Sequence, residues 1–153
     1  MTRTMRWFLP VLALALPFLF ATCEQGKDFE QTSKDVANLQ LTVPADSFVS
    51  FPFTVTDDYR TVPAYDDDVN LCVNFTQADG YEVECIVFTE DNYFAWEQRL
   101  PCEKLWNRIT AQGSNIVPSL ENGNFYLVFS NRDEPGAAVA LTSNCYVAYW
   151  RFK

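Results

Sequence analysis

The chain has 153 residues, 48% of them hydrophobic, so it is long enough for one domain with a substantial core. Twenty acidic residues against eleven basic ones give a formal net charge of −9 at pH 7, which argues against nucleic acid or an anionic lipid surface as a partner. The chain has no histidine, which excludes a Ser-His-Asp triad and leaves a cysteine nucleophile without its usual partner.

Residues 1–22 are predicted to be an export signal. Met1–Arg6 carries two arginines and no acid, and Trp7–Phe20 is apolar but too short for a comfortable membrane span. The junction Phe20-Ala21-Thr22-Cys23 resembles a bacterial lipobox, in which the cysteine is lipidated and becomes the first residue of the mature protein. We therefore expect an exported cell-envelope protein, an outer-membrane or surface lipoprotein held on the membrane by a lipid on Cys23. The alternative is ordinary secretory cleavage, which gives a soluble secreted protein.

After the signal, the chain divides into a tether and a domain. Residues 23–36 are mostly polar and charged, which predicts a flexible tether between the lipid and the domain. From residue 37 to residue 153, β-branched and aromatic residues alternate with polar ones, and turn residues such as Asp79-Gly80 separate the runs. Strands are predicted at 37–43, 48–56, 69–76, 81–87, 105–111, 115–120, 125–131 and 137–152.

One stretch, residues 90–100, fits either a short helix capped by Asp91 or a strand with its turn. No pattern of a long helix accompanies the short strands and their regular turns. The predicted fold class is therefore all-β: an antiparallel eight-stranded β-sandwich of the jelly-roll kind.

Three segments carry a resemblance to known domain families. Val43–Ser47 reads VPADS, Thr89–Tyr93 reads TEDNY, and Asn122–Asn131 reads NGNFYLVFSN. With their alternating strands, these segments resemble the Golgi-dynamics (GOLD) β-sandwiches and the bacterial pre-peptidase C-terminal domains, where a Gly-x-Tyr-x-Leu strand precedes the closing one. The resemblance covers residues 38–153, and it implies a non-catalytic interaction module of a secreted or trafficking protein.

The five cysteines are an odd number for a secreted protein, which lipidation of Cys23 would explain. The other four suffice for two disulfides in an oxidising compartment. A Cys72–Cys85 bridge across the intervening turn conflicts with the register that keeps the apolar sides of both strands together. In a jelly roll, the third strand lies beside the eighth and the fourth beside the fifth. The predicted disulfides are therefore Cys72–Cys145 and Cys85–Cys102.

The densest acidic residues supply hard oxygen ligands on loops between strands, and Ca²⁺ is the one cofactor that they suggest. The alternative is that these loops are only solvated, since their spacing is not that of an EF-hand. Paired carboxylates also serve glycosidases, but spacing in the sequence does not establish their separation in space. The residues concerned are Asp57, Asp58, Asp66, Asp67 and Asp68.

A group of aromatic residues forms a candidate platform for a sugar or a partner protein. The alternative is that these rings cap the open end of the sandwich, since aromatic side chains supply much of a core's buried area. The four residues are Tyr93, Phe94, Trp96 and Trp106.

The sequence as a whole predicts a non-catalytic envelope lipoprotein that acts as a binding or structural module for a protein, glycan or envelope partner. The alternative is a carbohydrate-active or calcium-dependent domain that uses the loop aspartates and exposed aromatics. Convergence of both kinds of residue in one concave pocket would favour a glycan or metal site, whereas scatter would favour a structural module.

Overall fold

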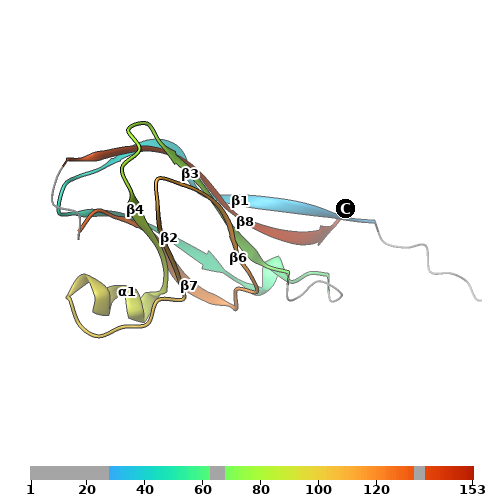
Figure 1. The fold of residues 1–153 in the computed structure, drawn as a ribbon. Coiled ribbons are helices and arrows are strands. Elements are labelled where there is room, and N and C mark those ends of the chain that lie inside the picture. The colour runs from blue at the N-terminus through green and yellow to red at the C-terminus, as the bar shows by residue number, and fades with distance from the viewer. Residues whose placement is uncertain (1–27, 63–67, 133–136) are drawn as a thin grey trace, which may run out of the picture.

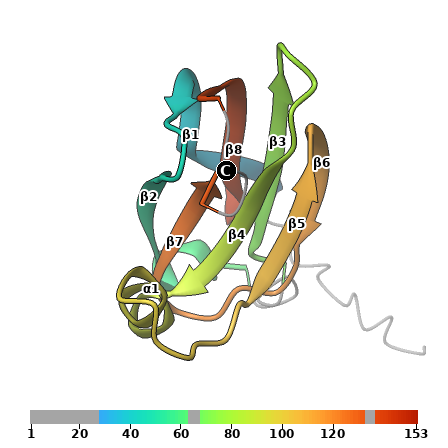
Figure 2. The same cartoon turned by 60° about the vertical axis from the view of Figure 1, so that its left-hand side comes forward.

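Two four-stranded antiparallel sheets form the domain in the computed structural model, which describes residues 28–62, 68–132 and 137–153 (Figure 1). One sheet has the strand order β1-β8-β3-β6, and the other has the order β2-β7-β4-β5 (Figure 2). The predicted all-β sandwich is confirmed. Its strands are β1 (Phe29–Val43), β2 (Phe48–Val55), β3 (Asn70–Gln77), β4 (Val83–Thr89), β5 (Trp106–Thr110), β6 (Gln112–Val117), β7 (Gly123–Ser130) and β8 (Val139–Phe152).

Neighbouring strands in each sheet come from distant parts of the chain. Strand β8 pairs with β1 and β3, and strand β4 pairs with β5 and β7. The jelly-roll neighbours expected from the sequence, the third strand beside the eighth and the fourth beside the fifth, are confirmed. Because β1 and β8 lie near opposite ends of the described chain, their long pairing closes the domain.

Strand β1 begins at Phe29 rather than near residue 37, so the predicted tether is wrong for residues 29–36. These residues pair with Tyr146–Phe152 of β8, apart from one register shift between Asp35 and Ala37. This segment is held at the edge of the sheet by backbone hydrogen bonds, which do not depend on the side chains. An exposed strand held in this way needs no alternation of apolar and polar residues, so the sequence pattern did not reveal it.

The helices are short and lie outside the two sheets. The ambiguous stretch after β4 forms α1 (Glu90–Glu97), and Asp57–Tyr59 forms the 3₁₀ turn η1. No helix within the described ranges is long and apolar enough to cross a membrane.

The main core lies between the inner faces of the two sheets. On β3, Leu71, Val73 and Phe75 are buried while the residues between them point outward, as the period of two requires. The fully buried Phe129 of β7 meets Phe75 edge to face, with ring centroids 5.3 Å apart, and so joins the two sheets. This pair places an aromatic contact at the centre of the sandwich.

A second, smaller cluster joins α1 to the outer face of the β2-β7-β4-β5 sheet. Tyr93 stacks on Tyr126 of β7 with ring centroids 3.9 Å apart. The Arg132 guanidinium lies 4.2 Å from the ring centroid of Trp96 and 4.6 Å from that of Phe48. It also donates a hydrogen bond of 3.2 Å to the carbonyl of Trp96, near the end of α1. Arg132 therefore fixes the helix by cation–π contact and by satisfying a terminal carbonyl.

Neither predicted disulfide is present, because all four described cysteines are free thiols. The neighbouring strands were predicted correctly, but the cysteine side chains on them point in different directions. On β3 and β8, Cys72 is opposite Tyr146 and points outward, while Cys145 is buried. Cys85 is likewise buried in the main core, whereas Cys102 packs against the cluster under α1. Both predicted pairings are therefore wrong, because adjacency of strands does not fix which face a residue takes.

The two buried cysteines are held as neutral thiols. Burial raises the pKa of Cys85 well above its ordinary 9.0, and the nearby Cys145 raises it further. Burial likewise raises the pKa of Cys145 to about 11, against the lowering effect of its hydrogen bonds with the backbone of Asn74 and Asn144. Since the thiolate is the reactive form, both cysteines are inert while the domain is folded.

We expect Phe129→Ala to lower the free energy of unfolding by roughly 3–5 kcal/mol, because it empties the centre of the core. The matched control is Ile116→Ala, which removes a side chain that is 63% exposed on β6 and should change stability by less than about 0.5 kcal/mol. Urea unfolding followed by circular dichroism measures both values. Equal losses for the two variants would show that Phe129 is not a core residue.

We expect two classes of thiol when the reduced chain, with Cys23 replaced by serine, meets Ellman's reagent at pH 8. Cys72 and Cys102 should react while the domain is folded, and Cys85 and Cys145 only after denaturation. A Cys72→Ser, Cys102→Ser double variant serves as the control and should show no fast phase. Fast reaction of all four thiols would contradict the burial of the second pair.

Candidate ligand-binding pocket at one end of the sandwich

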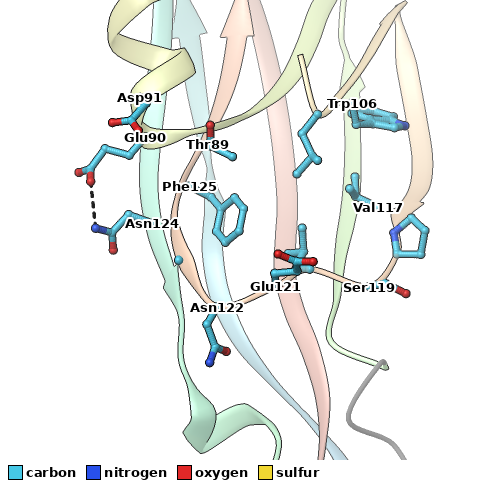
Figure 3. A pocket seen from close by; sticks show the side chains of 14 residues that line it. Thr89, Glu90, Asp91, Trp106, Val117, Ser119, Glu121, Asn122, Asn124 and Phe125 are labelled. Atoms are coloured by element: carbon cyan, nitrogen blue, oxygen red, sulfur yellow. Dashed lines mark hydrogen bonds between the residues drawn. The ribbon is translucent and has the colours of Figure 1, made fainter. Parts of the chain in front are cut away.

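A cavity of about 630 Å³, which we call the end pocket, lies at one end of the sandwich. Its lining comes from Thr89–Asp91, from Leu105 and Trp106, and from Val117–Phe125 (Figure 3). These segments meet because antiparallel pairing places the end of β4 beside the starts of β5 and β7. The pocket is therefore assembled from strand ends and turns, where ligand-binding residues commonly lie.

The walls of the end pocket are apolar and largely fixed. Val117, Leu120 and Phe125 are buried in the core. Figure 3 shows the Phe125 ring on the β7 side and Trp106 with Val117 on the side of β5 and β6. Trp106 is half-buried and Leu105 is 50% exposed, so both offer apolar surface to a ligand.

The turn between β6 and β7 is held rigidly against β3. The Leu120 amide donates to the carbonyl of Val69 at 2.8 Å, and the Ser119 amide donates to the Asn70 side chain at 3.1 Å. Arg60 donates to the carbonyl of Leu120. These bonds hold Ser119 in the left-handed region, with φ of 54°. A turn fixed in this way spares a ligand the cost of ordering it.

The polar rim of the end pocket is a set of oxygen acceptors. Glu90 accepts a hydrogen bond of 3.0 Å from the Asn124 side chain (Figure 3), and the Asn124 side chain accepts one of 3.0 Å from Thr54. Asp91 and Glu121 add two further carboxylates to the lining. Among the described residues that line the pocket, none is a lysine or an arginine. The rim therefore disfavours phosphate or carboxylate ligands and suits a ligand rich in hydroxyl or amine donors.

None of the three described residues among the predicted acids, Asp57, Asp58 and Asp68, lines the end pocket. Asp57 and Asp58 lie in η1, where the Asp57 carboxylate accepts a hydrogen bond from Asn122. The Asn122 side chain points away from the Phe125 ring in Figure 3. Asp68 contributes its carbonyl to a hydrogen bond with Asn70, and Asp66 and Asp67 lie outside the described residues. Across the described ranges, no group of three Cys, Asp or Glu side chains is placed to hold a metal ion.

The structure divides the predicted aromatic platform. Tyr93 is buried on the side of α1 that packs against the sheet, and Trp96 packs on Phe48 and Phe88 with ring centroids 5.0 and 5.3 Å away. Phe94 lies on the same helix and is 43% exposed. Trp106 alone of the four lines the end pocket. The first three rings thus stabilise the helix, and one ring remains as a ligand contact.

The sequence pattern missed the acceptors of the rim, Glu90, Glu121 and Asn124. Residues 121–124, Glu-Asn-Gly-Asn, stood out only as a turn between two strands. Glu90 stood in the ambiguous stretch after β4. Both segments consist of polar residues at the ends of strands, and such residues gather at one edge of a sandwich. This placement was the feature of the sequence that could have indicated the site. The strand order, however, was needed to show that these two ends meet.

Comparison with known proteins gives no relative from which a role can be carried over. No protein-family model matches the chain, and no curated protein matches it. The resemblance to GOLD and pre-peptidase C-terminal domains stays a prediction. The function has to be argued from the chemistry of the end pocket.

Proposed function

We propose that the chain is an exported, lipid-anchored binding module of the cell envelope and that it binds a saccharide in the end pocket without chemical conversion. The observation that carries the proposal is the pocket itself, which joins the half-buried Trp106 to acceptors on Glu90 and Asn124. The ring offers a flat apolar surface to the C–H face of a sugar, and the acceptors suit its hydroxyl groups. The carboxylates of Glu90, Asp91 and Glu121 in the described lining favour a neutral or amine-bearing sugar over an anionic one.

Two features of the chain support the anchored location. The apolar run Trp7–Phe20 ends just before Cys23, in the arrangement of a lipoprotein signal. The described domain then begins at Asp28, which leaves a short connection from the lipid. A module held close to a membrane by such a connection can act on the saccharides of its own envelope.

A carboxylate-dependent glycosidase is the second candidate, because Glu90, Asp91 and Glu121 line the same pocket. Such an enzyme needs one carboxylic acid and one carboxylate on opposite sides of the scissile bond. Product formation distinguishes the two candidate functions, because a glycosidase releases new reducing ends from an oligosaccharide and a binding module does not.

We expect Trp106→Ala to weaken saccharide binding by roughly tenfold or more, because stacking on an aromatic ring is worth about 0.5–1.5 kcal/mol beyond the buried area. Isothermal titration against neutral oligosaccharides of glucose, mannose and N-acetylglucosamine measures the loss. Phe94→Ala is the matched control, since Phe94 is exposed but lies outside the pocket. Equal affinity of both variants, or no binding of any saccharide by the native chain, would rule out the end pocket as a sugar site.

The Glu121→Gln variant removes a negative charge from the pocket while keeping the shape of the side chain, and so tests whether the ligand is charged. A neutral saccharide should keep most of its affinity, because an amide oxygen still accepts hydrogen bonds. A cationic ligand should lose roughly tenfold, since a hydrogen bond to a charged group is worth about 1.5–3 kcal/mol. A large loss with a neutral sugar would contradict the proposed chemistry.

We expect the mature protein to begin at Cys23 and to carry a diacylglyceryl group on that sulfur. Intact mass spectrometry of the protein purified from membranes measures the added mass, and detergent partitioning measures the membrane association. Cys23→Ser is the control and should give a water-soluble or uncleaved product. An unmodified mature N-terminus at another residue would show ordinary secretory cleavage instead.

A further inference from the structure

The outer face of the β1-β8-β3-β6 sheet carries two parallel rows of uncharged polar side chains. These four strands lie side by side in Figure 2. Because side chains that are paired across antiparallel strands share one face, each row can be followed from one strand to the next. The first row consists of the paired residues Gln40, Thr142, Thr76 and Gln112. It crosses the whole sheet, a width of roughly 14 Å for four strands.

The second row is parallel to the first and lies two residues further along each strand, roughly 7 Å away. It consists of the paired residues Asn38, Asn144, Asn74 and Ser114. The Asn74 side chain donates a hydrogen bond of 3.2 Å to the carbonyl of Asn144, which holds the Asn74 amide in place. We call these two rows together the polar face.

The polar face is open to solvent. The residues that alternate with it, such as Val73, Phe75 and Ser143, are buried between the sheets, so its own side chains point outward. All of its members are exposed except Asn74, which is half-buried. A ligand therefore has access to the full width of both rows.

A groove of about 520 Å³ borders the first row of the polar face. Its lining comes from Gln40–Thr42, Thr76–Ala78 and Ala140–Thr142. The small side chains of Ala78 and Ala140 occupy little of this space, and the Thr42 hydroxyl adds one more group that donates and accepts hydrogen bonds. Every described residue that lines the groove is uncharged. The groove therefore offers a neutral, hydrogen-bonding surface.

The groove is separate from the end pocket. Asn70, at the start of β3, accepts a hydrogen bond from the Ser119 amide in the turn that lines the end pocket. Thr76 lies six residues further along the same strand, which corresponds to roughly 20 Å. The two cavities therefore lie towards opposite ends of β3, and one can be altered without the other.

The composition of the polar face selects its ligand. Charged residues make up 20% of the chain, yet none of the eight residues in the two rows is charged, so the face has no specific attraction for an ion. None is tryptophan, tyrosine or arginine, the residues that dominate binding between proteins, which disfavours a protein partner or a second copy. Side-chain amides and hydroxyls both donate and accept hydrogen bonds, which suits a neutral ligand rich in hydroxyl groups.

The shape of the sheet selects between two kinds of hydroxyl-rich ligand. Adjacent strands of a sheet are rotated by about 20–25° relative to one another, so the groups of each row do not lie in one plane. A rigid crystalline surface would meet only part of such a row. A single flexible glycan chain can follow it and make several weak hydrogen bonds at once.

We propose that the polar face and its groove are a second saccharide site, which binds a neutral glycan chain through the hydroxyls of Thr76 and Thr142 and the flanking amide side chains. This site goes beyond the end pocket and does not depend on it. An end pocket that binds no sugar would leave the polar face as the only saccharide site among the two.

Affinity electrophoresis tests the second site. The chain from residue 23, with Cys23→Ser, contains every described residue, and its net negative charge carries it through native gels that hold dextran, galactomannan or glycol chitin. A Trp106→Ala background disables the end pocket. The test variant adds Thr76→Val and Thr142→Val, which replace each hydroxyl by a methyl group and keep a good strand former. The matched control adds Thr56→Val and Thr61→Val, two exposed threonines outside both cavities.

We expect at least one of the three polysaccharides to retard the Trp106→Ala chain. The Thr76→Val, Thr142→Val pair should then weaken the apparent affinity by about fivefold or more, the effect of losing two neutral hydrogen bonds, while the control pair leaves it unchanged. Circular dichroism checks that both variants stay folded.

Retardation that Trp106→Ala leaves intact and the valine pair removes would support the polar face even as it refutes the end pocket. A Trp106→Ala chain that no polysaccharide retards, or whose retardation the valine pair leaves intact, overturns the proposal. Self-association of the native chain that the valine pair removes, measured by sedimentation, would overturn it too, because a second copy would then occupy the face.

Discussion

The register between β8 and its two neighbours is the constraint on which the rest of the structure depends. Because side chains alternate along a strand, a slip of one residue would turn every side chain of β8 to the opposite face. The observed register buries Cys145 and Val147 and turns Tyr146 outward. The same alternation, continued past Ala148, places Trp150 and Phe152 on one face of the paired ends of β1 and β8. A single pairing therefore decides which side chains of β8 enter the core and which face its last residues take.

The end pocket depends on a second constraint, the alternation of strand directions. In an antiparallel sandwich, the ends of some strands and the starts of their neighbours meet at one edge. Here the end of β4, the start of β5 and the turn before β7 meet, and they bring Glu90 and Trp106 to the same cavity as Asn124. The buried Leu120 and Phe125 give that cavity a rigid wall, so its shape is part of the core.

Attachment and binding form one consistent picture in our proposal. The formal net charge of −9 disfavours contact of the protein surface with anionic lipid, and the lipid on Cys23 would supply the attachment. Arg60 connects the end of β8 to the pocket wall through its contacts with Trp150 and Leu120. The pocket carries acceptors and an aromatic ring, which suit a sugar near the membrane surface.

The sequence by itself determined the fold class and most of the strands, because these follow from local signals. The alternation around Val73 and the turn residues before Phe125 act over a few residues, and tertiary contacts did not override them. The sequence also singled out Trp106, although it grouped that ring with Tyr93 and Trp96, which pack from α1 onto the sheet.

The tertiary structure alone decided two kinds of feature: which face of a sheet a side chain takes, and which strand ends from distant parts of the chain meet. Residues 29–36 form a strand through backbone bonds to β8, which no side-chain pattern records. Cys72 and Cys145 lie on adjacent strands, yet only the register shows that one faces out and the other faces in. Glu90 and Asn124 meet in the end pocket because two strand ends, far apart in the chain, lie side by side. Local periodicity specifies elements, whereas the pairing of those elements creates sites, because a site joins residues that the sequence keeps apart.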